Sequence, residues 1–324
     1  MASCCSGQEL DTSVIIVSWN ARDYLLNCLR SLANPVGHTQ EVLVVDNAST
    51  DGSGEAVAEQ FPQVRLIRNR ENVGFARANN IGIKEAKGRY LALINSDVIV
   101  LDRCLPRLLA FMDANPEAGI CGPRILNPDR TLQARCRHFP TVWNNLCQIS
   151  GLNRLFPKSS FFSESFMRYW PHDEVRKVDV ITGCFWFVRA EAVNGVGLLD
   201  DGFFFYGEDV DWCKRFHDAG WDVVFYPHAE AIHFGGGSSR NAPVRFYLEL
   251  QKADLRYWRK HHGRLGQCSC WSLILLRHLT RIPYDALMFL LCASKRPQAA
   301  FKLRRARACL GWLLSGGRHA TKSA

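Results

Sequence analysis

The first third of the chain alternates short apolar runs with stretches in which apolar residues recur every three or four positions. The runs have the length of buried strands and cover residues 13–18 (SVIIVS), 41–46 (EVLVVD), 64–68 and 90–95 (YLALIN). The stretches between them have helical periodicity and cover residues 23–32, 54–61 and 75–86. Strand and helix in strict alternation predict an α/β protein whose mostly parallel sheet is covered on both faces.

The pattern is less regular after residue 97. It predicts two further helices and three further strands around one irregular stretch. The helices are expected at 105–113 and 210–219, the strands at 119–125, 178–188 and 222–226, and the irregular stretch at 127–165. From Pro243 a helical pattern continues, and charged residues interrupt its best apolar run before it reaches the ~20 residues that span a bilayer. We therefore expect an N-terminal extension (1–12), an α/β domain (13–243) and a basic, amphipathic helical tail (244–324).

Composition is that of an ordinary globular protein. The 324 residues are 47% hydrophobic and 22% charged, which excludes a disordered or low-complexity chain. The net charge of +9 is concentrated in residues 244–324, which hold 16 Lys or Arg against 3 Asp or Glu. Such a tail favours contact with an anionic membrane surface; the alternative is a helical subdomain that packs on the α/β domain. The 13 cysteines lack zinc-ligand spacing and the N-terminus lacks a signal pattern, which favours a cytoplasmic location.

Polar side chains follow three of the predicted strands directly. They are Ser18, Trp19, Asn20, Asp46, Asn47, Asn95, Ser96 and Asp97. Because the carboxyl ends of parallel strands meet at one edge of a sheet, where α/β proteins bind ligands, we expect these side chains to line one crevice. Each residue alone is also a common turn former, so the prediction depends on the three sets converging.

Asp97 and His233 are candidate metal ligands. The chain has no G-x-x-x-x-G-K-[ST] motif and no G-x-G-x-x-G after the first strand, so a bound phosphate would need a metal. Asp97 suits a divalent cation, Mg²⁺ or Mn²⁺, as an oxygen ligand. His233 precedes glycines 235–237, which suit a loop that closes over a ligand, although a lone histidine is more often structural.

The densest acidic feature is residues 203–211, FFFYGEDVD. Glu208 and Asp209 fall in the first turn of a predicted helix, where the helix dipole stabilises negative charge. They are either simple N-terminal helix acids, or one of them is a general base whose surroundings the preceding aromatic residues shape.

Seven segments, in order across residues 13–239, resemble glycosyltransferase family 2 and, within it, the rhamnosyltransferase-like branch. They read SVIIVSWN, VLVVDNASTDGS, ENVGFARANNIGI, GRYLALINSDV, ITGCFWFVRAEA, GLLDDGFFFYGEDVDWCKRFHDAGW and HFGGGSS. The resemblance implies a GT-A fold with a Rossmann-like mixed sheet as the catalytic domain, at 13–243. It also implies a nucleotide-diphosphate sugar donor, a divalent cation, and transfer with inversion at the anomeric carbon.

The family pattern implies a set of donor-binding residues. By resemblance, Trp19 stacks on the base and Asp46 with Asn47 reads the pyrimidine edge. Asn72, Gly74 and Asn79 line the donor pocket in the family pattern, and Asn95 contacts the donor. The strand-end residues Ser18, Asn20 and Ser96 complete the expected donor-binding set.

The family pattern also implies a metal ligand and a base. Residues 95–97 correspond to the metal-binding D-x-D motif with Asn in the first position, which leaves Asn95 to hydrogen-bond ribose or sugar and Asp97 to bind the metal. His233 matches a histidine that completes the metal site in some relatives. Asp209 corresponds to the catalytic base, with Glu208 as its neighbour or as an acceptor contact.

The resemblance thus implies an inverting glycosyltransferase of surface-polysaccharide synthesis. The expected donor is dTDP-L-rhamnose, with UDP- or GDP-sugars as alternatives, and the expected acceptor is a lipid-linked glycan at the inner face of the cell membrane. A nucleotidyltransferase would carry a Gly-rich triphosphate loop, and SVIIVSWNARD is not one. A non-catalytic nucleotide-sugar-binding homologue would tolerate loss of Asp97 and Asp209, which are present. No nucleic-acid-binding motif occurs, so no nucleic-acid partner is expected.

Overall fold

The computed structural model describes residues 10–315, apart from 34, 36, 164 and 236–242. Most of the predicted N-terminal extension, and glycines 236–237 of the predicted loop, lie outside the described residues. The described residues belong to two units, the first drawn from 1–139, 170–204 and 208–240, the second from 140–169, 205–207 and 241–324.

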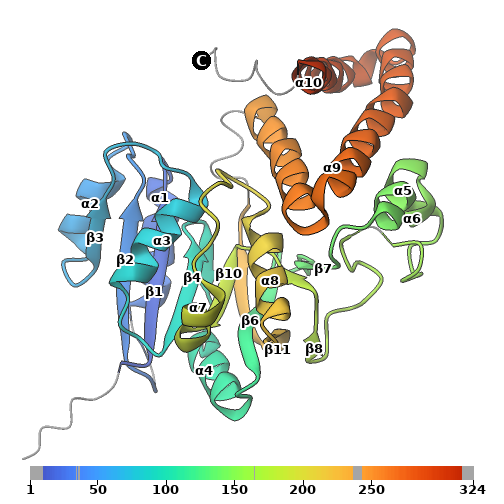
Figure 1. The fold of residues 1–324 in the computed structure, drawn as a ribbon. Coiled ribbons are helices and arrows are strands. Elements are labelled where there is room, and N and C mark those ends of the chain that lie inside the picture. The colour runs from blue at the N-terminus through green and yellow to red at the C-terminus, as the bar shows by residue number, and fades with distance from the viewer. Residues whose placement is uncertain (1–9, 34, 36, 164, 236–242, 316–324) are drawn as a thin grey trace, which may run out of the picture. The chain divides into compact units, whose positions relative to one another are not determined.

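The first unit is built on a nine-stranded mixed sheet among the described residues, in the order β3-β2-β1-β4-β10-β6-β11-β5, with β8 paired to β11 (Figure 1). Its parallel half contains β1 (Thr12–Ser18), β2 (Gln40–Asp46), β3 (Arg65–Arg68) and β4 (Tyr90–Asn95). The other half contains β5 (Val98–Val100), β6 (Ala118–Leu126), β8 (Arg176–Lys177), β10 (Phe185–Arg189) and β11 (Asp222–His233). A separate two-stranded sheet pairs β7 (Cys136–Arg137) with β9 (Val180–Ile181).

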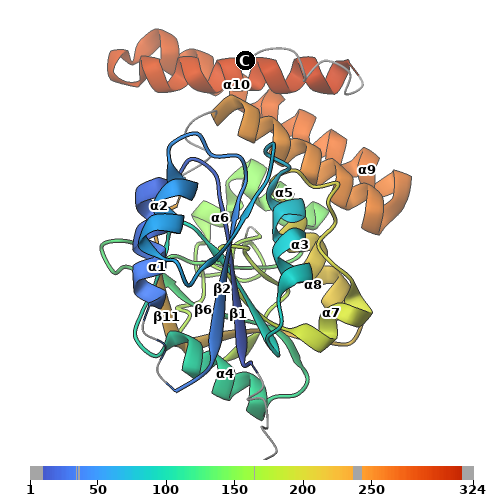
Figure 2. The same cartoon turned by 90° about the vertical axis from the view of Figure 1, so that its left-hand side faces the viewer.

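Helices cover both faces of this sheet, as expected from the alternating pattern. They are α1 (Arg22–Leu32), α2 (Ser53–Gln60), α3 (Phe75–Glu85), α4 (Cys104–Ala114), α7 (Ala190–Val196) and α8 (Glu208–Asp218). Figure 2 shows α1 and α2 on one side of β1 and β2, with α3, α7 and α8 on the other. The predicted Rossmann-like mixed α/β architecture is therefore confirmed.

The structure differs from the expected elements where pairing partners are distant in the sequence. The expected strand at 178–188 is divided into two strands, because the Cys184 backbone N–H donates to Thr182 O at 2.8 Å and turns the chain between β9 and β10. β10 then pairs antiparallel with both β4 and β6. The strand expected at 222–226 continues to His233 after a register shift between Tyr226 and Glu230.

The second unit is helical. It contains α5 (Val142–Ser150), α6 (Leu152–Leu155), α9 (Pro243–Leu291), η2 (Ala293–Lys295) and α10 (Arg296–Leu314). α9 bends at Gly263, whose φ of 65° lies in the left-handed region that glycine adopts without strain. None of the described helices is long and apolar enough to cross a membrane.

The stretch 127–165, expected to be irregular, contributes α5 and α6 to this helical unit. The contact is specific: the Arg277 guanidinium of α9 donates to Asn145 Oδ1 at 3.0 Å and to Gln148 Oε1 at 3.1 Å. Residues 140–169, which the predicted domain boundaries assign to the α/β domain, thus group with residues 241–324. The tail predicted from residue 244 onward is helical in its described part, beginning at Pro243.

A buried ion pair holds α8 in place. The Asp211 carboxylate is fully buried and receives the Arg215 Nε hydrogen bond one turn later, at 2.9 Å. The same guanidinium donates to the carbonyls of Val196 and Leu198, at 2.9 and 2.8 Å. Arg215 therefore connects α8 to the segment after α7, and it compensates a charge that no solvent reaches.

Replacing Arg215 with Ala should lower the free energy of unfolding by about 3–5 kcal/mol, because the buried Asp211 carboxylate loses this cation. Urea-induced unfolding followed by tryptophan fluorescence measures the loss. The matched control is Lys214→Ala, which removes a partly exposed pair with Asp218 on the same helix and should cost about 1 kcal/mol at most. Equal losses in the two variants would contradict the role assigned to the buried pair.

Candidate functional site

Strand register brings the predicted polar residues to one edge of the sheet. Ser18 pairs directly with Asp46 between β1 and β2, and Val17 pairs with Asn95 between β1 and β4. The side-chain oxygens of Ser18 and Asn95 are buried without a hydrogen-bond partner among the described residues. Since buried polar atoms are normally hydrogen-bonded, these two oxygens are candidates for ligand contacts.

The loops after β1 and β2 are tied together beside this edge. Asn20, at a positive φ of 49°, accepts the Thr50 backbone N–H at Oδ1 (2.7 Å), and its own N–H donates to Ser49 Oγ at 2.9 Å. The Asp46 carboxylate accepts the Ser49 backbone N–H at 3.0 Å. Trp19 is half-buried next to these residues in the chain, so its indole ring is partly accessible.

Asn47 organises the loop before α3. Its Oδ1 accepts from Asn69 Nδ2 at 3.0 Å and from the Val73 backbone at 3.1 Å, while its Nδ2 donates to Asn72 Oδ1 at 2.8 Å. Asn47 therefore positions Asn72, and its contact with a pyrimidine stays a prediction.

Gly74 and Asn79 lie at the beginning and in the middle of the same helical segment. Gly74 has a φ of 87°, and a Cβ there would lie 2.6 Å from Phe204 O, so a larger residue would displace the loop. The Phe75 backbone N–H donates to this same carbonyl. Asn79 is buried in α3 and donates to Phe75 O at 2.9 Å, so its amide is engaged within the helix.

Asp97 and His233 lie side by side although 136 positions separate them in the chain. β11 pairs with β5 so that His233 is opposite Val98, and its Nε2 lies 3.3 Å from Asp97 Oδ1. Both side chains are buried, and Phe234 donates its backbone N–H to Asp97 O at 3.0 Å. Two distant predictions thus converge on one place.

The donor atoms in this pair suit a divalent cation that also binds the substrate. No group of three or more His, Cys, Asp or Glu side chains in the described chain could hold a metal by itself. Mg²⁺ and its analogues, however, are commonly held by one or two carboxylates together with substrate phosphates and water. Asp97 and His233 fit that arrangement, and the unpartnered Asn95 oxygen lies on the strand that leads into it.

Two residues that the sequence analysis did not single out fix the histidine. His233 Nδ1 lies 2.7 Å from Gln133 Oε1 and 2.9 Å from Arg135 Nη2. Gln133 Nε2 also donates to the His233 carbonyl at 3.2 Å. Such contacts on the second ring nitrogen orient an imidazole and leave its first nitrogen for another partner.

A third residue of the same extended segment reaches the acidic helix. Arg137 Nη1 lies 3.7 Å from Asp209 Oδ2. Residues two apart in an extended chain point to the same side, so Gln133, Arg135 and Arg137 share one side that leads from His233 to Asp209. The only sequence signal for this row is the alternation of polar side chains in TLQARCRHF, within the stretch expected to be irregular.

The two adjacent acids of α8 have different surroundings. Asp209 accepts the Val210 backbone N–H at 2.9 Å and faces Arg137. Glu208 is buried, and its Oε2 has no hydrogen-bond partner among the described residues. Burial and the neighbouring Asp209 charge raise the pKa of Glu208 to about 8, so Glu208 is mainly protonated at neutral pH.

The aromatic residues before these acids divide between the two units. Phe203 is buried in the first unit. Phe205 and Tyr206 belong to the second unit, where Phe205 packs edge-on against Phe246 of α9 with ring centroids 4.9 Å apart. The chain therefore passes from the first unit to the second at Phe205 and returns to the first at Glu208.

Comparison with known proteins connects this geometry to a family. The family described as glycosyl transferase family 2 matches residues 13–173. The N-acetylglucosaminyl-diphospho-decaprenol L-rhamnosyltransferase of Mycobacterium tuberculosis is 29% identical over 261 residues, which cover 77% of this chain and 84% of that protein.

Solved structures agree on the fold. The mannosyltransferase PcManGT from Pyrobaculum calidifontis, in complex with GDP-Man and Mn²⁺, matches 95% of this chain and 88% of its own, with a TM-score of 0.55 and 14% identity. GalNAc-T7 with UDP, GalNAc and Mn²⁺ matches 78% of this chain with a TM-score of 0.54 and 17% identity. This chain spans about half (49%) of the GalNAc-T7 chain. The chain is a GT-A-fold glycosyltransferase that belongs to glycosyltransferase family 2.

Proposed function

We propose that this enzyme transfers an L-rhamnosyl group, with inversion, from dTDP-L-rhamnose to a lipid-linked glycan. The observation that carries the reaction type is the row of Gln133, Arg135 and Arg137, which contacts a candidate cation ligand at one end and a candidate base at the other. The choice of rhamnose and of a lipid-linked acceptor rests on the similarity to the mycobacterial rhamnosyltransferase, named for a diphospho-decaprenol acceptor.

In this proposal the donor lies at the carboxyl ends of β1, β2 and β4. Trp19 stacks on the base, Asp46 accepts from it, and the buried oxygens of Ser18 and Asn95 receive ribose or sugar hydroxyls. Asp97 and His233 would hold the divalent cation. A cation bound there neutralises the charge that develops on the departing diphosphate.

Asp209 is the proposed base because it faces Arg137, whereas the other acid of the pair, Glu208, is buried and keeps its proton. A base must accept a proton, and Glu208 already carries one at neutral pH. The Arg137 guanidinium attracts the Asp209 carboxylate and fixes its orientation. Asp209 then removes the proton of the acceptor hydroxyl as that oxygen attacks the anomeric carbon from the face opposite the diphosphate, which inverts the centre.

Among candidate nucleotide sugars, dTDP-L-rhamnose with Mn²⁺ should release its nucleoside diphosphate faster than UDP- or GDP-sugars do. Asp97→Ala should abolish this Mn²⁺-dependent release, because the cation loses its carboxylate ligand. Asp102→Asn, which removes an exposed acid a few residues further along, is the control and should keep the activity. Preference for another nucleotide sugar would contradict the proposal that dTDP-L-rhamnose is the donor. Full activity of Asp97→Ala would contradict the proposal that Asp97 binds the cation.

Asp209→Asn should slow transfer by about 100- to 10,000-fold, the usual contribution of a general base, while the dissociation constant of the donor stays nearly unchanged. Single-turnover transfer and calorimetric donor binding separate the two effects. Glu208→Gln is the matched control because it imitates the protonated side chain and should retain most of the activity. Transfer lost in Glu208→Gln but kept in Asp209→Asn would reverse the assignment.

The raised pKa of Glu208 should make the protein less stable as the pH rises. Between its ordinary value near 4.5 and about 8, Glu208 keeps in the folded state a proton that it loses in the unfolded chain. The free energy of unfolding therefore falls across this window. Glu208→Gln should flatten the fall in urea titrations at several pH values, whereas the exposed Glu191→Gln should not. An unchanged slope in Glu208→Gln would contradict the buried, protonated state.

A further inference from the structure

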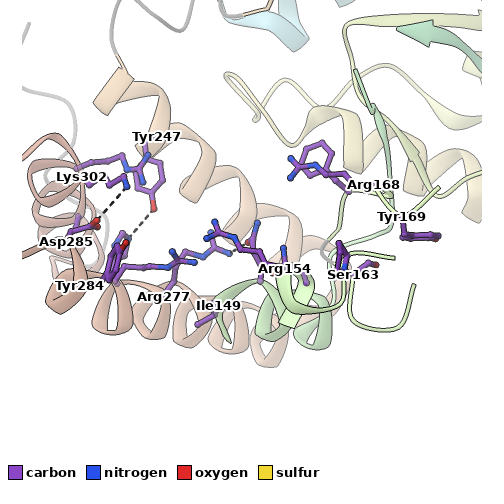
Figure 3. A pocket seen from close by; sticks show the side chains of 18 residues that line it. Ile149, Arg154, Ser163, Arg168, Tyr169, Tyr247, Arg277, Tyr284, Asp285 and Lys302 are labelled. Atoms are coloured by element: carbon purple, nitrogen blue, oxygen red, sulfur yellow. Dashed lines mark hydrogen bonds and ion pairs between the residues drawn. The ribbon is translucent and has the colours of Figure 1, made fainter. Parts of the chain in front are cut away.

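The helical unit contains a cavity of about 640 Å³, and none of the residues proposed for sugar transfer lines it. Side chains from α5, α6, the segment after α6, both arms of α9, and α10 line it, as Figure 3 shows for Arg154, Arg277 and Lys302. Every lining residue belongs to the second unit. This volume is within the range of cavities that hold small organic ligands.

The cavity is strongly cationic. It is lined by six Lys or Arg side chains and one acid, Asp285. The six cations are Arg154, Arg168, Arg277, Arg281, Lys302 and Arg305. Lys302 lies 3.7 Å from the Asp285 carboxylate, so the single acid offsets one cation and leaves a large positive excess.

Several of these cations have capacity for a further partner. The side chains of Arg154 and Arg281 make no hydrogen bond or ion pair with the described part of the chain. The Arg305 guanidinium lies over the Tyr247 ring, 4.1 Å from its centroid, and its Nε is buried without a hydrogen-bond partner among the described residues. Guanidinium groups in such a position bind phosphate oxygens in pairs.

His278 reports the positive field inside the cavity. Its ring is buried, and Tyr247 Oη lies 3.4 Å from its Nε2. Burial, and after it the charges of Arg277 and Arg305, lower the pKa of His278 to about 4. The part of this shift that comes from the two arginines indicates that an anion would be attracted to the same place.

Exposed apolar side chains occur on the helices that line the cavity. Large exposed hydrophobic residues in the described chain, apart from Val175, all lie in the helical unit. On α6, Leu155 (70% exposed) directly follows the cavity residue Arg154. On α9, Leu279 and Leu287 are exposed on either side of the cavity residue Tyr284 along the helix. Exposed apolar side chains contribute nothing to the binding of a free phosphate ion. A lipid has both a charged headgroup, which the cations can bind, and apolar chains, which these side chains can contact.

We propose that this cavity binds the phosphate headgroup of a membrane lipid, with the exposed apolar side chains in contact with the acyl or prenyl region. The recognition chemistry is that of a multiply charged phosphate, held by the arginines of α6, α9 and α10. The site goes beyond the proposed sugar transfer and does not rest on it, because it needs neither nucleotide sugar nor cation. With this site, the helical unit recognises a particular headgroup, and its contact with a membrane does not depend on negative charge alone.

The test compares binding of the full chain to three kinds of vesicle in the absence of nucleotide sugar. The vesicles are phosphatidylcholine alone, phosphatidylcholine with phosphatidic acid, and phosphatidylcholine with an equal charge of phosphatidylserine. The Arg154→Gln/Arg281→Gln variant should bind phosphatidic acid vesicles about tenfold more weakly, because two charged hydrogen-bonding groups are removed. The control Arg304→Gln/Arg307→Gln removes the same charge from exposed positions of α10 outside the cavity. It should change binding by about twofold at most.

Each other outcome counts against the proposal. Equal weakening of both variants, or equal binding to phosphatidic acid and phosphatidylserine, would mean a general electrostatic attraction. Calorimetric titration with inorganic pyrophosphate distinguishes the source of the phosphate. If pyrophosphate binds and the cavity variant loses this binding while phosphatidic acid vesicles show no preference, the ligand is a soluble phosphate and the lipid assignment is wrong. Unchanged circular dichroism and thermal unfolding of both variants show that neither effect comes from misfolding.

Discussion

The pairing of β1 with its two parallel neighbours is the constraint on which the rest of the site depends. Ser18 meets Asp46, and Asn95 lies one pair away, because three strands of similar length begin and end together. A slip of one residue would turn each of these side chains to the opposite face of the sheet. The apolar cores of the strands resist that slip, because residues on both covered faces, such as Val14 and Ile15, are fully buried and would have to exchange places in closely packed surroundings. The packing of the strand cores thus determines which polar side chains meet at the carboxyl ends of β1, β2 and β4.

The first turn of α8 shows how one helix end can give three acids three different states. Glu208 keeps its proton because its burial and the neighbouring Asp209 charge, which raise its pKa, outweigh the attraction of Arg137. Asp209 faces Arg137 across 3.7 Å. Asp211 is sealed from solvent against Arg215 and serves stability alone. Carboxyl groups within one helical turn therefore differ in state according to their burial and to the arginine that lies closest to each of them.

Local periodicity in the sequence was sufficient to predict the elements that alternate in the first third of the chain, and strands such as β1 and β4 lie where expected. The same periodicity predicted that the polar residues after these strands lie at one edge of the sheet, because the carboxyl ends of neighbouring parallel strands always do. It could not reveal β7, which is two residues long, or the roles of Gln133 and Arg135, whose partner His233 lies about 100 residues away. Nor could it show that β10 runs antiparallel, because an apolar run carries no direction.

The short extended segment from Gln133 to Arg137 has a consequence for how the site can change. Its three alternating side chains hold His233 at one end and face Asp209 at the other. The insertion or deletion of a single residue within this segment would rotate part of the row away from its partners. The proposed cation ligand and the proposed base thus contact the same segment of five residues. If the proposed roles hold, a change in the length of this segment would disturb the cation ligand and the base together, whereas a substitution that keeps its length would leave the other contacts of the row in register.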